Sequence, residues 1–286
     1  MLGPILVGSA VAATVAGIVE VPANETVAVI GAGLIGATSW NLLTWWRGLP
    51  SSSGQALVGG LVGAALMQGG TSAVNWGGFD GWRPVGVIGT VVALAISPVI
   101  GAVGAFAVLR LLKRGLRRAS SRARNPVNRS QWPGAAALAF SHGSNDAQKA
   151  VGLIAALLLA EGKVDSLAVP TWAMVGSAAA LTLGTAFGGW KIVRTIGQRI
   201  YHIRPLDGFS SQATSSVVIL GASFIGAPIS TTHVVASSIV GVGAGRRRWH
   251  HVRWTIVREM GIAWVTTMPA SALVGAMAFI LWREVA

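Results

Sequence analysis

Long apolar runs, separated by short polar segments, fill most of the chain. The runs lack the polar face that a surface helix of a soluble protein repeats every third or fourth residue, and they lack the alternation of a membrane β-strand. Most of them approach the length of about 20 residues at which a helix crosses a bilayer. We therefore expect an all-α, polytopic membrane protein. The predicted spans lie at 2–19, 26–46, 51–68, 84–109, 132–160, 168–188, 209–226, 229–244 and 255–282.

The first run, 2–19, has the length and position of a secretory signal. It lacks the basic residues with which such a signal begins, so we interpret it as a spanning helix. The composition agrees with a membrane protein, with a mean hydropathy of +0.62 and 11% charged residues. Thirty-eight glycines favour close helix packing, and the absence of cysteine excludes disulfides and thiolate metal sites.

The net charge of +13 raises the question of nucleic-acid binding. The basic residues gather in three segments beside apolar runs, at 110–129, 190–207 and 245–254. The positive-inside rule produces this distribution, whereas a nucleic-acid-binding protein would show a reader motif or a basic face with aromatic residues. We expect no nucleic-acid partner, and we place the three basic segments in the cytoplasm. The segments expected outside are 20–25, 69–83 and 161–167.

The run at 132–160 carries a cluster of polar and ionisable side chains near its middle. Ionisable groups at this depth cost about 2.5–3.5 kcal/mol each on insertion scales and are functional by default. We expect a substrate or ion site within the membrane, with a break in the helix at Gly143 and Ser144. One alternative stays open, since Asp146 and Lys149 at i, i+3 can simply neutralise each other. The cluster comprises His142, Asn145, Asp146, Gln148 and Lys149.

Two distant segments share a pattern of proline, hydroxyl residues and a glycine-bearing apolar helix. They follow Pro50 and Pro228. The charges of the flanking loops give the two segments opposite orientations if 26–68 and 209–244 are each a helical hairpin. Such inverted repeats are typical of secondary transporters built from broken helices, with the site near the midplane. In the alignment, Pro50 matches Pro228, Ser52 matches Ser230, Ser53 matches Thr231, Gln55 matches His233 and Gly63 matches Gly241.

Each proline tip is predicted to be the N-terminus of a helix buried in the membrane, because proline is tolerated in a first turn and serine or threonine caps the free N–H groups. A helix N-terminus carries about +0.5 charge and binds anions. Two such helix ends that meet at one point could bind a tetrahedral oxyanion reversibly, so that the anion can be released again. Alternatively, the hydroxyls only bond back to their own helices. The hydroxyl donors are Ser51, Ser52, Ser53, Ser230, Thr231 and Thr232.

Other chemistry has weaker support in the sequence. His142 and His233 without clustered carboxylates are poor evidence for a metal site. A phosphohydrolase built on His142 and Asp146 would need a nucleophile or a metal set that the sequence does not offer. The glycine-rich runs 31–36 and 59–63 follow no predicted strand, so they favour helix packing over nucleotide binding. We therefore expect a protein that is not an enzyme and holds no cofactor or metal.

The motifs resemble those of the inorganic phosphate transporter (PiT) family, especially its small bacterial members. The resemblance rests on 142–149, 228–233 and the serine-rich tip at Pro50, with 188–191 and 266–270 in addition. It implies two inverted repeats that bind phosphate and a coupling cation, H⁺ or Na⁺, at the midplane. It assigns phosphate binding to Ser52, Ser53, Asn145, Asp146, Ser230, Thr231 and Thr232. It assigns cation coupling to Asn145, Asp146 and Gln148, supported by His142, Lys149, Gln55 and His233.

Two features depart from the family pattern. No earlier copy of the Asn-Asp motif precedes the Pro50 tip, and Gln55 stands where the family usually has histidine. We therefore expect a cation-coupled phosphate symporter that looks N-terminally truncated, with sulfate symport or a non-transporting truncated membrane protein as alternatives. The expected division is 1–112 for the rest of the first repeat and scaffold helices, 113–130 for a basic cytoplasmic loop, and 131–286 for the second repeat.

The expected location is the inner (plasma) membrane of the cell, which the chain crosses several times. The expected partners are the lipid bilayer and inorganic phosphate, either free or as a metal–phosphate complex. A homodimer stays open.

Overall fold

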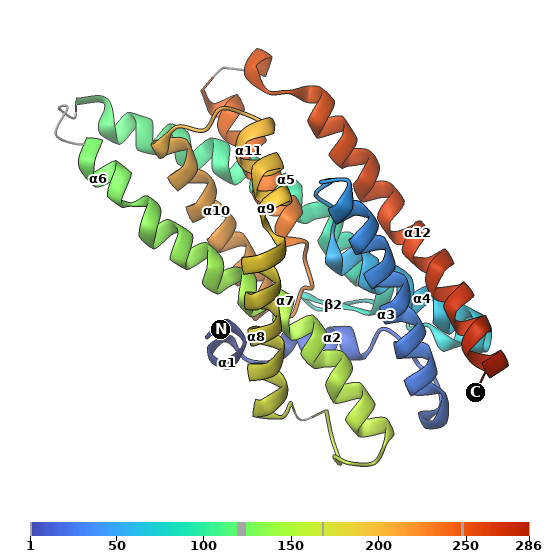
Figure 1. Ribbon diagram of the computed structural model, residues 1–286. Helices are drawn as coiled ribbons and strands as arrows, with labels where there is room; N and C mark the ends of the chain where they lie inside the picture. Colours follow the sequence, from blue (N-terminus) through green and yellow to red (C-terminus); the bar gives the residue numbers. More distant parts are fainter. Residues whose placement is uncertain (1, 119–123, 168, 247–248, 286) are drawn as a thin grey trace.

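The structure is a computed structural model that describes residues 2–118, 124–167, 169–246 and 249–285 (Figure 1). Two short strands, β1 (Gly78–Asp80) and β2 (Arg83–Val85), pair antiparallel. Short 3-10 turns cover Gly70–Ala73, Leu116–Arg118 and Trp249–His251, and a π-helical turn covers Thr195–Arg199. The α-helices are α1 (Gly3–Val7), α2 (Ala10–Ala16), α3 (Ala23–Trp46), α4 (Ser53–Gly69), α5 (Gly86–Gly115), α6 (Arg124–Arg129), α7 (Gln131–Ala160), α8 (Thr171–Gly188), α9 (Trp190–Arg194), α10 (Pro205–Phe224), α11 (Thr231–Gly245) and α12 (Trp254–Val285).

Four helical segments of the described residues are long and apolar enough to cross a membrane. α7 is also long, at 30 residues, but it carries the polar cluster in its middle. These observations confirm the predicted all-α membrane fold. The four segments are Ala23–Trp46, Ser53–Ala73, Gly86–Arg118 and Trp254–Glu284.

Two local expectations are wrong. Residues 2–19 do not form one spanning helix, because α1 and α2 are separated at Gly8, whose φ of 93° lies in the region that favours glycine. The predicted break at Gly143 and Ser144 is absent, and α7 continues through both residues. The Ser144 hydroxyl donates to the Ser141 carbonyl at 2.7 Å, so its polarity is satisfied within the helix. Glycine inside a helix costs only about 1 kcal/mol, which the packing of α7 outweighs.

The pairs α3–α4 and α10–α11 are two hairpins with the same turn at their tips. Gly48 and Gly226 occupy equivalent positions with φ values of 69° and 74°. The next N–H group bonds back to the carbonyl five residues earlier in each tip, over 2.9 Å from Leu49 and 2.8 Å from Ala227. A turn that needs positive φ therefore recurs at the positions that the alignment pairs.

The helix that follows each tip begins with an equivalent serine cap. Ser52 accepts a hydrogen bond from the N–H of Gln55 at 3.1 Å, and Ser230 accepts one from the N–H of His233 at 3.3 Å. Both serines have extended backbone, as N-cap residues do. The prediction that each tip is a capped helix N-terminus is confirmed.

The second helix of each hairpin packs against the last long helix of the other repeat. α4 lies against α12, and α11 lies against α5. Equivalent glycines allow this close approach, because a Cβ atom on Gly63 would overlap the carbonyl of Ala272, and a Cβ atom on Gly241 would overlap the carbonyl of Ala102. The two repeats therefore pack against each other through two equivalent helix–helix contacts, α4 with α12 and α11 with α5.

Replacing either glycine by leucine is expected to destabilise the fold. In both G63L and G241L the new side chain meets a backbone carbonyl that cannot rotate away, and overpacking of this kind costs about 1–3 kcal/mol or more. The melting temperature of the purified protein in detergent measures the effect. Gly176 in α8 offers the matched control, because a Cβ atom there has no atom within 4 Å. Equal melting of all three variants would contradict the exchanged packing.

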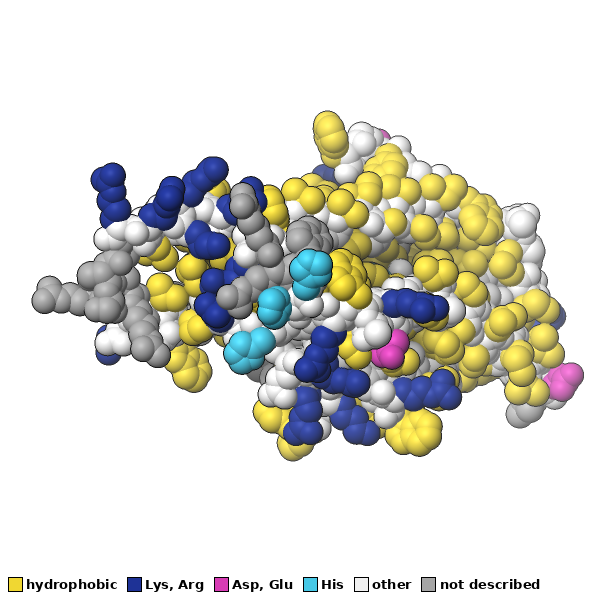
Figure 2. Space-filling view, turned by 90° about the horizontal axis from the view of Figure 1, so that it is seen from above, with side chains coloured by type: hydrophobic (Ala, Val, Ile, Leu, Met, Phe, Trp, Pro, Cys, Tyr) yellow, Lys and Arg dark blue, Asp and Glu magenta, His cyan; other side chains and the backbone are white. Residues whose placement is uncertain are grey.

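The C-terminal ends of α5 and α11 both lie at the top of Figure 1, and the view from above in Figure 2 shows Lys, Arg and His side chains gathered on this face. The loop between α7 and α8, which carries Glu161 and Asp165, lies at the opposite end. Asp207 and Arg246 pair at 2.5 Å and tie the open end of the second hairpin together at its basic side.

Candidate functional site

The middle of α7 meets both hairpin tips at Lys149. Its ammonium lies 2.5 Å from Asp146 Oδ1 and donates to the Ile229 carbonyl of the second tip at 2.7 Å. A Cβ atom placed on Gly54, in the first turn of α4, would lie 3.0 Å from the same Nζ atom. The structure thus brings the two distant tips to one buried cation.

Asp146 binds partners with both of its carboxylate oxygens. Oδ1 contacts Lys149, while Oδ2 accepts from the Thr231 hydroxyl at 2.7 Å and lies 3.3 Å from His142 Nε2. The Asp146 side chain is 9% exposed and that of His142 is 37% exposed. The i, i+3 pair considered as a structural alternative does form, but it also binds the first turn of α11. A role confined to mutual neutralisation does not account for that contact.

Asn145 and Gln148 lie on the same helix but face different neighbours. The Asn145 amide donates to Ala227 O at 3.0 Å and to Ser223 Oγ at 3.2 Å, so it holds the second tip. Its Oδ1 atom is buried and has no hydrogen-bond partner within the described part of the chain. Gln148 Oε1 instead accepts from the first N–H groups of α2, at 3.0 Å from Val11. The structure therefore places Gln148 as a cap for α2, away from Asp146.

The predicted phosphate donors differ in their availability. Ser52 and Ser230 are buried and accept from their own helices, which leaves each hydroxyl hydrogen free to donate elsewhere. Thr231 is buried and occupied by Asp146. Ser53 is exposed, and Thr232 is partly exposed.

A residue that the sequence analysis did not select joins the two tips. Trp264 of α12 stacks on the His233 ring, with centroids 4.0 Å apart, and its Nε1 donates to Pro50 O at 3.1 Å. The sequence could have indicated Trp264 by its position, because it lies inside the predicted span 255–282 and away from the membrane interfaces that tryptophan prefers. His233 Nε2 is buried, and so is Gln55 Oε1 at the aligned position of the other tip; neither atom has a hydrogen-bond partner among the residues that the structure describes.

A cavity of about 530 Å³ lies between α7 and α8, and Asp146 is one of its lining residues. Apolar residues line most of it, including Ala150 of α7 and Trp172 of α8. Asp146 is the charged residue on its wall, so the candidate site borders this cavity on the side of α8. No pattern in the sequence indicated this part of α8.

Comparisons with known proteins agree with this arrangement. Residues 1–129 and 116–275 match the phosphate transporter family. The probable low-affinity inorganic phosphate transporter of Bacillus subtilis is 41% identical over 255 residues, which cover 88% of this chain and 74% of the relative. A protein of the same description from Rhizobium meliloti is 40% identical over 265 residues, covering 92% and 76%.

A solved structure has the same fold. It is described as the sodium-dependent phosphate transporter, and it superposes with a TM-score of 0.84 at 24% identity, over 100% of this chain and 88% of that one. At this identity the likeness concerns the fold. On the family match and the two bacterial relatives, the chain belongs to the phosphate transporter family.

Proposed function

We propose that this protein is an inorganic phosphate symporter of the plasma membrane, coupled to H⁺ or Na⁺. The observation that carries the proposal is the meeting of the α4 and α11 N-termini at Lys149. The relatives, named as phosphate transporters, support the substrate. Whether phosphate is carried free or as a metal complex, and whether the protein is a homodimer, stay predictions.

The geometry suits a phosphate ion placed between the tips. Two helix N-termini contribute about half a positive charge each, and the Lys149 ammonium adds a full charge between them. The proposal takes the hydroxyls of the two tips as further donors, and Ser52 and Ser230 are buried at the two caps. Ser53, Thr231 and Thr232 extend this donor set within the first turns. The arrangement binds a tetrahedral oxyanion mainly through hydrogen bonds, which can be exchanged when it leaves.

The contacts of Asp146 suggest how a cation couples to phosphate. In the described conformation Asp146 holds both Thr231 and Lys149, the donors that phosphate would need. A proton or Na⁺ bound at Asp146 would neutralise the carboxylate and release these two donors to the anion. We propose Asn145 Oδ1, which is buried and has no hydrogen-bond partner among the described residues, as a second oxygen ligand for the cation. The part of Gln148 in coupling stays a prediction, because its amide caps α2.

Orientation follows from the charge distribution. We propose that the end carrying 110–129, 190–207 and 245–254 faces the cytoplasm, since basic segments remain on that side of a membrane. The clustering of Lys and Arg on one face in Figure 2 supports this orientation.

Uptake of labelled phosphate into proteoliposomes tests the proposed function. Uptake should rise with an imposed gradient of Na⁺ or of protons, and excess sulfate should compete poorly. Liposomes with protein but without a gradient provide the control. Absence of uptake under every gradient would refute the proposal. Strong competition by equimolar sulfate would indicate that sulfate is also a substrate.

Cysteine labelling tests whether both tips face one anion. The chain has no native cysteine, so Ser53→Cys and Thr231→Cys carry single reporters. We expect faster reaction of Ser53→Cys with a membrane-impermeant maleimide, because Ser53 is exposed and Thr231 is buried. Saturating phosphate should slow both reactions. Asn128→Cys, in exposed α6, should react at the same rate with and without phosphate. Unchanged labelling of either tip would mean that the hairpins do not share a site.

A further inference from the structure

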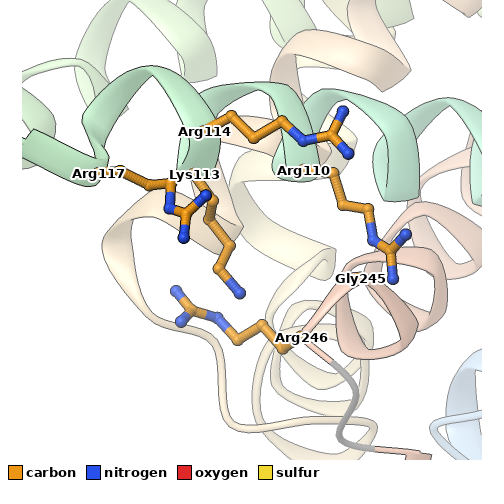
Figure 3. A pocket seen from close by; sticks show the side chains of 6 residues that line it. All are labelled: Arg110, Lys113, Arg114, Arg117, Gly245 and Arg246. Atoms are coloured by element: carbon orange, nitrogen blue, oxygen red, sulfur yellow. The ribbon is translucent and has the colours of Figure 1, made fainter.

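A second pocket lies at the basic end of the molecule, between the C-terminal ends of α5 and α11. Its volume is about 350 Å³. Figure 3 shows the cationic side chains along the C-terminal end of α5 and the 3-10 turn that follows it, with Arg246 on the opposite side, directly after α11. The lining residues are Arg110, Lys113, Arg114, Arg117, Gly245 and Arg246.

The positive charges in this pocket are only partly balanced. Arg246 pairs with the buried Asp207 at 2.5 Å. Among the described residues, no ion pair joins the three cations of α5 or Arg117 of the following turn to a carboxylate, and Arg110 lies over the Phe106 ring instead. The C-terminal ends of α5 and α11 contribute about half a negative charge each. An excess of about three positive charges remains after Asp207 and the two helix ends are counted.

We propose that this pocket binds an anion that carries two or more phosphate groups. One inorganic phosphate has too few oxygen atoms to contact all five cationic side chains, whereas two or three linked phosphate groups offer acceptors over a wider span. Arginine guanidinium groups pair with phosphate oxygens through two parallel hydrogen bonds, and the pocket presents four of them beside one lysine. The ligand chemistry fits a diphosphate lipid headgroup, since basic pockets between membrane helices bind such lipids, and equally a soluble polyphosphate.

The pocket is separate from the proposed transport site. Thr231 begins α11 and Gly245 ends it, so the helix of 15 residues holds the two sites about 22 Å apart. The two sites therefore share a helix but no lining residue. Binding at the pocket does not depend on the proposed transport of phosphate.

Binding of labelled tripolyphosphate to the purified protein in detergent tests the proposal. We expect saturable binding that 10-fold excess inorganic phosphate does not displace and that Asp146→Asn leaves intact. The double variant Lys113→Gln/Arg117→Gln should bind at least about tenfold more weakly, because two charge-assisted contacts are lost. The control Arg129→Gln/Arg199→Gln removes the same charge from exposed positions outside the pocket and should bind normally. Equal loss in both double variants would reduce the effect to general electrostatics and overturn the proposal.

A second arm identifies the source of the phosphate groups. The same measurement is made in nanodiscs of phosphatidylcholine alone and of phosphatidylcholine with cardiolipin. Suppression of tripolyphosphate binding by cardiolipin, lost in Lys113→Gln/Arg117→Gln, would assign the pocket to the lipid. Binding that persists in cardiolipin would assign it to a soluble polyphosphate. If neither tripolyphosphate nor cardiolipin binds to the wild-type protein in a way that the pocket variant weakens, the proposal is wrong.

Discussion

Replacing Asp146 by asparagine is expected to abolish gradient-driven phosphate uptake while phosphate binding persists. Asparagine keeps the size of the side chain and can still accept from Thr231 and Lys149, but it cannot hold a proton or attract Na⁺ as a carboxylate does. If the carboxylate contributes about 2 kcal/mol or more to holding the cation, as buried charge partners do, coupled uptake should fall by about 30-fold or more. Proteoliposome uptake under an imposed gradient measures this loss.

The same variant separates coupling from binding. If a cation acts by freeing Thr231 and Lys149 from the carboxylate, phosphate binding in Asp146→Asn should no longer depend on Na⁺ or pH. Equilibrium binding of labelled phosphate, measured across Na⁺ concentrations and pH values, reports this directly. Asp165→Asn removes an exposed carboxylate from the α7–α8 loop and should leave both properties unchanged. Retained gradient-driven uptake, or binding that keeps its cation dependence, would show that Asp146 is not the coupling residue.

The hairpins could be predicted from the sequence because their determinants are local. A glycine that takes positive φ, a proline and a capping serine recur at Gly48, Pro50 and Ser52 and again at Gly226, Pro228 and Ser230, and the turn requires little else. The break expected in α7 failed for a related reason. Glycine and serine permit a break, but the surrounding packing decides whether one forms.

The polar cluster of the candidate site could be recognised in the sequence, but the contacts that its members make could not. An ionisable cluster within an apolar run is expensive in a membrane, and this identified Asp146 and Lys149. Their partners come from residues about 80 positions away, so no spacing rule indicates that Lys149 meets Ile229 O. Trp264 was missed because an aromatic residue within an apolar span carries no local sign of the ring or carbonyl it will contact. Gln148 is polar and lies within the cluster, as a site residue would, yet its side chain caps α2.

Replacing Lys149 by methionine is expected to destabilise the protein strongly. Methionine fills a similar volume but leaves Asp146 buried without its ammonium partner, and the Ile229 carbonyl of the second tip loses its donor. Breaking a buried ion pair in this way costs about 3–5 kcal/mol. The melting temperature and the monodisperse yield in detergent measure the loss. Lys163→Met gives the matched control, since its pair with Glu161 spans 2.6 Å but the two side chains are 65% and 42% exposed. An exposed pair of this kind contributes about 0–1 kcal/mol.

The double variant Asp146→Asn/Lys149→Met separates stability from function. Removing both charges eliminates the unpaired buried carboxylate, so we expect much of the lost stability to return, and a double-mutant cycle gives the interaction energy of the pair. Gradient-driven uptake should stay absent, because no carboxylate remains to hold the cation and no ammonium remains between the tips. Recovery of uptake together with stability would reduce the pair to a structural role. Failure of the double variant to regain stability would mean that the Lys149 contact with Ile229 O, rather than the ion pair, holds the second tip in place.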